Sequence, residues 1–138
     1  MNISVIDGSN YFKGLLLLIR KDKKVTKEEY ELMTRIGKIL GFDQAFIEES
    51  IQEILKNRFI STLPPVFSNR DIAEKFLKDG LIIAASDNEI HYDEENWLCS
   101  VADNNNIVKS WLYEEKGKIL QLKKSARKLE ADNLKVIF

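Results

Sequence analysis

The sequence has 138 residues, of which 44% are apolar and 31% are charged. Its 21 basic and 22 acidic residues leave a formal net charge of −1, which excludes a global attraction to nucleic acid or anionic lipid. Cys99 is the single cysteine, which excludes an intramolecular disulfide and a cysteine-based zinc cluster.

The length is that of one ordinary domain, so we expect a single domain over residues 1–138. The longest apolar run, Leu15 to Ile19, is far shorter than the roughly 20 residues of a membrane span. Asp7 argues against a signal peptide. We therefore expect a cytoplasmic protein with no membrane span.

Apolar residues recur with helical spacing along most of the chain, and no comparable stretch alternates with period two. Thr26 followed by Glu29 predicts a capping box, Asp43 predicts the start of a further helix, and Gly41 predicts a helix end. Phe46 and Leu55 are expected on the buried face of one of these helices. We predict helices over 9–21, 27–40, 44–57, 69–86, 92–103 and 107–132.

The last of these helices, over 107–132, is predicted to be long and amphipathic. Its basic part covers residues 116–132. Lys123, Lys124 and Arg127 belong to its charged face, which we interpret as a solvated surface. Contact with a membrane surface or RNA is the alternative for this face.

An internal repeat is the strongest organisational signal in the sequence. Laying Leu17 over Ile82, an offset of 65 residues (82 − 17), aligns the two segments without a gap. The alignment pairs Asp22 with Asp87, Glu28 with Asp93, and Glu29 with Glu94. Because acidic positions match as well as apolar ones, we infer a duplicated helical hairpin.

The fold class predicted from this repeat is all-α, a helical bundle with two pseudo-symmetric helix-loop-helix units. We place repeat 1 at about 10–57, a connector at about 58–68, repeat 2 at about 69–115 and the basic C-terminal helix at about 116–132.

Two segments carry a resemblance to a known family: residues 21–29, KDKKVTKEE, and residues 86–94, SDNEIHYDE. In each, an Asp near a helix end is followed by an aliphatic residue and by acidic residues that open a second helix. This pattern, with the continuation IGKILGFD at residues 36–43, resembles the tellurite-resistance TerB-like family over roughly residues 10–115. The resemblance implies a bundle of antiparallel helical hairpins and a role in stress-related systems.

The same resemblance implies acidic surfaces that hold divalent cations. Lys21, Lys23 and Lys24 surround the first Asp and disfavour a cation there, so the second loop is the better candidate. The candidate metal ligands are Asp22, Glu28, Glu29, Asp87, Glu89, Asp93 and Glu94.

An EF-hand is excluded in both copies. That loop needs Gly at its sixth position and Glu at its twelfth, whereas counting from Asp87 reaches Tyr92 and Leu98. Helix capping and the helix dipole are the alternative explanation for the acidic pairs, and they require no ligand.

Enzyme chemistry has little support, because His91 is the only histidine and no nucleophile motif is recognisable. We therefore expect a non-enzymatic TerB-like interaction or scaffold module whose partner is another protein. The alternative is a domain that binds a divalent cation or a small ligand through the acidic hairpins. No cofactor is required by either interpretation, and nucleic acid is not the expected partner.

Overall fold

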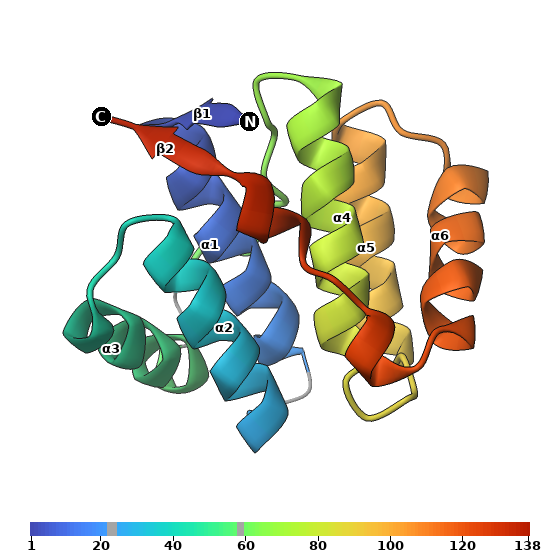
Figure 1. Ribbon diagram of the computed structural model, residues 1–138, viewed down its shortest axis with the longest axis horizontal. Coiled ribbons are helices and arrows are strands. Elements are labelled where there is room, and N and C mark those ends of the chain that lie inside the picture. The colour runs from blue at the N-terminus through green and yellow to red at the C-terminus, as the bar shows by residue number, and fades with distance from the viewer. Residues whose placement is uncertain (22–24, 58–59) are drawn as a thin grey trace.

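A computed structural model describes residues 1–21, 25–57 and 60–138. Within these ranges the fold is all-α, as the sequence predicted, with one small pair of strands (Figure 1). In chain order the elements are β1 (Asn2–Ser4), α1 (Val5–Arg20), α2 (Lys27–Ile39), α3 (Gln44–Lys56), α4 (Arg70–Ala84), α5 (Tyr92–Asn104), α6 (Lys109–Gln121), two short 3₁₀ turns (Lys124–Ala126 and Glu130–Asn133) and β2 (Lys135–Ile137).

The helices form two pseudo-symmetric units of three helices each. Helices α1, α2 and α3 begin at residues 5, 27 and 44, and α4, α5 and α6 begin 65 residues later, at 70, 92 and 109. Figure 1 shows α1 and α4 side by side in the centre, with α2 and α3 against α1, and α5 and α6 against α4. The offset found in the sequence therefore extends from a helix pair to a third helix in each unit.

Equivalent turns end the second helix of each unit. Gly41 has φ of +96° and Asn106 has φ of +59°, the left-handed conformation that Gly adopts freely and that Asn tolerates best among other residues. The residue after each turn donates its N–H to a carbonyl of the preceding helix. Phe42 donates to Gly37 and Ile107 donates to Ala102, both at 2.9 Å. The local chemistry of the two copies is thus matched as well as their helix lengths.

The core is centred on the contact between α1 and α4. Tyr11 and Phe76 are equivalent residues, and their rings meet edge to face with centroids 5.4 Å apart. Gly14 lets the helices approach closely, because a Cβ at this position would lie 2.7 Å from the Phe76 ring. The apolar run from Leu15 to Ile19 is buried throughout, which explains why it lacks a polar face.

The segment that follows each unit crosses the first helix of that same unit. The connector crosses α1 and the C-terminal segment crosses α4, at equivalent positions. In the connector, Pro65 lies over Gly14, with its Cγ 3.1 Å from the place of a Cβ. The Asn105 side chain holds this crossing by bonding the Pro65 carbonyl at 2.9 Å and the Phe67 N–H at 2.9 Å.

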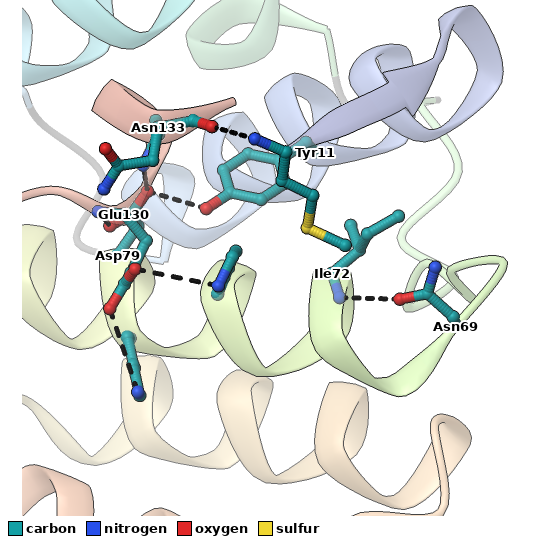
Figure 2. Close-up of polar contacts among 10 residues, drawn as sticks. Tyr11, Asn69, Ile72, Asp79, Glu130 and Asn133 are labelled. Carbon is teal, nitrogen blue, oxygen red and sulfur yellow. Dashed lines mark hydrogen bonds and ion pairs between the residues drawn. The ribbon is translucent and has the colours of Figure 1, made fainter. Parts of the chain in front are cut away.

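In the C-terminal segment (residues 122–138), the equivalent crossing is polar. Asp79 stands at the position of Gly14 and is fully buried. It accepts hydrogen bonds from the Glu130 N–H at 2.6 Å, the Ala131 N–H at 3.0 Å and the Tyr11 hydroxyl at 2.6 Å (Figure 2). Burial raises the pKa of Asp79 to about 7, although these three donors oppose the shift. One carboxyl group therefore joins α1, α4 and the C-terminal segment.

The prediction of one basic helix over 107–132, with its basic part over 116–132, is wrong. Helix α6 ends at Gln121, and Leu122 has extended backbone. Arg127 explains part of this ending, since it donates to the Ile119 carbonyl at 3.0 Å and to the Ala85 carbonyl at 2.9 Å. The buried apolar residues of this stretch belong partly to α6 and partly to the crossing segment, where Leu129 is buried.

The strand pair is a second feature that the sequence did not predict. Strands β1 and β2 are parallel, with Ile3 opposite Val136, and the Met1 amino group bonds the Asn133 carbonyl at 2.6 Å. Each strand has three residues, which is too short for a period-two pattern to emerge.

We predict that Asp79 gives the protein a characteristic pH dependence of stability. The pKa of Asp79 is higher in the folded state than in the unfolded chain, so this group stabilises the fold most below about pH 4 and less as the pH rises towards 7. Asp79→Asn stays neutral and should flatten this decline, measured as the free energy of urea unfolding between about pH 5 and pH 8.

Asp71→Asn is the matched control, because Asp71 is exposed on the same helix. The groups that face Asp79 are Tyr11 on α1 and Glu130, whose carboxylate lies 3.9 Å from Lys75 and 3.8 Å from Lys78. If the free energy of unfolding of Asp79→Asn falls with pH as steeply as that of the wild type, Asp79 is not the group responsible.

Candidate functional site

Two of the predicted metal ligands, Glu29 and Glu94, are buried helix caps. The Glu29 carboxylate accepts the Thr26 N–H at 3.0 Å while the Thr26 hydroxyl accepts the Glu29 N–H at 3.1 Å, which forms the predicted capping box. In the second copy the Glu94 carboxylate accepts the His91 N–H at 3.3 Å. Both side chains turn inward to their own helix ends, where the dipole favours their charge.

The other candidate ligands that the structure describes, Glu28, Asp87, Glu89 and Asp93, do not share one site. Glu28 pairs with Lys124 at 3.2 Å, and Asp87 lies 3.4 Å from the His91 ring while accepting the Glu89 N–H at 3.1 Å. The Glu89 and Asp93 side chains are exposed, and Asp93 lines a separate pocket.

The candidates that the structure describes do not come together as a cation site. Within residues 1–21, 25–57 and 60–138 no three His, Cys, Asp or Glu side chains are grouped so that they could hold a metal ion. Asp22 lies outside the described residues, so its predicted role stays a prediction. The second loop, which the sequence favoured, uses Asp87 to organise the turn and Glu94 to cap α5.

A second candidate site is a groove between α1 and α3, with a volume of about 720 Å³. Leu16 and Ile54 form its buried floor, and Ile60 also lines it. The full lining comprises Lys13, Leu16, Phe46, Glu48, Glu49, Ser50, Gln52, Glu53, Ile54, Lys56 and Ile60.

Phe46 is the most informative residue of the groove. We expected Phe46 and Leu55 on the buried face of this helix, but they are 46% and 36% exposed. The buried stripe of α3 is narrower and consists of Ile47, Ile51 and Ile54. Phe46 stacks on Phe42 with ring centroids 5.0 Å apart, so it is held in place at the groove while much of its surface faces solvent.

The rim of the groove carries more negative than positive charge. The lining contains three carboxylates, Glu48, Glu49 and Glu53, and two ammonium groups, Lys13 and Lys56. Glu48 accepts the Gln44 amide at 2.9 Å and the Tyr30 hydroxyl at 3.2 Å, and no ion pair links it to a cation among the described residues. An apolar floor with an acidic rim can bind a ligand that combines apolar and cationic groups.

A prediction distinguishes capping from metal binding at Glu29 and Glu94. Glu29→Ala and Glu94→Ala should each lower the free energy of unfolding by about 1 kcal/mol, because a helix cap is lost. Glu29→Gln and Glu94→Gln should retain most of the stability, since an amide oxygen accepts the same N–H group.

Urea unfolding with and without about 1 mM calcium, magnesium, manganese or zinc measures both effects. Stabilisation by a cation that either Gln variant abolishes would show that these carboxylates are ligands and would contradict the capping assignment.

Comparison with known proteins identifies no relative of this chain. No family model matches the chain, and no curated protein or solved structure matches it either. The TerB-like resemblance therefore stays a prediction. None of the helices in the described part of the chain has the length and apolar character of a membrane span.

Proposed function

We propose that this protein is an interaction module that binds a basic amphipathic helix of another protein in the groove between α1 and α3. The observation that carries the proposal is Phe46, which is 46% exposed beside a groove with an apolar floor and an acidic rim. This role keeps the non-enzymatic interaction or scaffold function expected from the sequence.

The apolar floor supports a helical partner. A helix laid into a groove buries residues at spacings of three and four, and the exposed face of Phe46 with Leu16 and Ile54 offers a surface for such anchors. Aromatic anchors of this kind contribute much of the affinity of protein interfaces, because they lose a large solvated area on binding.

The rim supports a basic partner. Three carboxylates, on Glu48, Glu49 and Glu53, outnumber the two ammonium groups of Lys13 and Lys56. Lysine or arginine residues beside the apolar anchors of the partner would be attracted to this rim, and an acidic helix would be repelled. Charge then selects among helices that all fit the apolar floor.

We predict that a photo-crosslinking amino acid at Gln52 captures a partner of defined mass in the native host lysate. Gln52 is exposed on the groove side of α3. Gly117 is the matched control, because it is the equivalent exposed position of α6 and has open space around it. Gel mobility and mass spectrometry measure the adducts.

We further predict that the double variant Glu49→Lys, Glu53→Lys reduces the yield of this adduct by roughly tenfold, because the rim becomes positive. Phe46→Ser should reduce it to a similar extent by removing the apolar anchor. Equal adducts from Gln52 and Gly117, or a yield unchanged by charge reversal, would contradict the proposal.

A further inference from the structure

The repeat creates two equivalent pockets, each where the segment after one unit crosses a helix pair. The α5 pocket has a volume of about 640 Å³ and is lined by Arg20, Lys21, Thr62, Pro64, Asp93, Asn96, Trp97 and Ser100. The α2 pocket has a volume of about 370 Å³ and is lined by Glu28, Glu31, Leu32, Arg35, Ile82, Ser86, Lys124 and Arg127. Most positions correspond at the offset of 65, as Thr62 does to Arg127 and Asp93 to Glu28.

The cations of the α2 pocket are all engaged by the protein itself. Lys124 pairs with Glu28 at 3.2 Å, and Arg35 pairs with Asp132. Arg127 donates to two backbone carbonyls and to the Asn88 side chain, the last at 3.3 Å. Each cation of this lining therefore already has a hydrogen-bond or ion-pair partner within the protein.

The α5 pocket differs because its cations are not engaged in this way. The Arg20 Nη1 atom is buried from solvent and has no hydrogen-bond partner among the described residues. Lys21 lies over the Trp97 ring, with its Nζ 5.4 Å from the ring centroid, and has no ion pair in the described part of the chain. A buried guanidinium nitrogen without an acceptor is rare in folded proteins, so Arg20 has an unmet hydrogen bond that a ligand in the pocket could satisfy once the side chain turns towards it.

We propose that the α5 pocket binds the anionic oxygen atoms of a small carboxylate or phosphate compound. Arg20 lines the pocket, and a planar guanidinium carries paired donors that match a carboxylate or phosphate, while Lys21 adds a second positive charge. Asn96, Ser100 and Thr62 supply polar side chains on the same lining.

The charge of the lining favours an anion overall, because it contains two cationic side chains, Arg20 and Lys21, and a single carboxylate, Asp93. Trp97 already donates its indole N–H to the Gly14 carbonyl at 3.2 Å, so it offers the ligand a ring surface and not a hydrogen bond. This pocket lies between α1, α5 and the connector, away from the α1–α3 groove, and the inference does not depend on the proposed function.

Titration of the whole protein with inorganic phosphate and, separately, with succinate tests the proposal and distinguishes the two kinds of anion. Both are added at constant ionic strength, and NMR follows the Arg20 side-chain N–H and the Trp97 indole N–H. We expect saturable shifts of these two signals with at least one anion, while the Trp111 indole signal stays in place.

Arg20→Gln should weaken this binding at least tenfold, and Arg20→Lys should weaken it less, because the charge is kept and the planar fork is lost. Lys124→Gln is the matched control, since it removes one positive charge from the equivalent α2 pocket and should leave the affinity unchanged. Thermal unfolding checks that each variant is folded.

Absence of a saturable shift with either anion, up to roughly 50 mM, would overturn the proposal. An Arg20→Gln variant that binds as tightly as Lys124→Gln would overturn it as well. Neither result bears on the α1–α3 groove, whose residues are unchanged in these variants.

Discussion

The packing of α1 against α4 is the contact on which the rest of the molecule depends. Both helices are buried along most of their length, and they meet at the equivalent rings of Tyr11 and Phe76. The other four helices lie on the outside of this pair: α2 and α3 pack against α1, α6 packs against α4, and α5 packs against both (Figure 1). Because no single unit could cover its central helix on both sides, each unit completes the core of the other.

The two copies have diverged by coupled changes at their crossings. In the connector, Pro65 has no N–H to satisfy, and Gly14 provides only room. In the C-terminal segment, Glu130 and Ala131 bring two N–H groups into the interior, and Asp79 provides the acceptor. Exchanging either residue alone would create a steric clash or leave buried donors unpaired. In one of the two equivalent pockets every cation has a partner within the protein, whereas in the other a nitrogen of Arg20 has none among the described residues.

Local sequence signals predicted the helices well, because caps and apolar spacing act within a few residues. Thr26 with Glu29 and Gly41 are examples. The helix predicted for the C-terminal segment was wrong, because the conformation of this segment depends on the distant Asp79. At the sites, the acidic pairs were visible in the sequence, but their capping role depends on which way each side chain turns. Phe46 and Ile47 are neighbours with opposite exposure, and the missing partner of Arg20 is a property of tertiary packing alone.

The pairing of β1 with β2 also bears on how the chain folds. The bond between Met1 and Asn133 joins residues 132 positions apart, so it closes a loop that spans almost the whole described chain. Closing such a loop costs conformational entropy before any contact offsets it, whereas each three-helix unit can form from short-range contacts. We therefore expect the strand pair and the Asp79 crossing to assemble late and to open first during local unfolding.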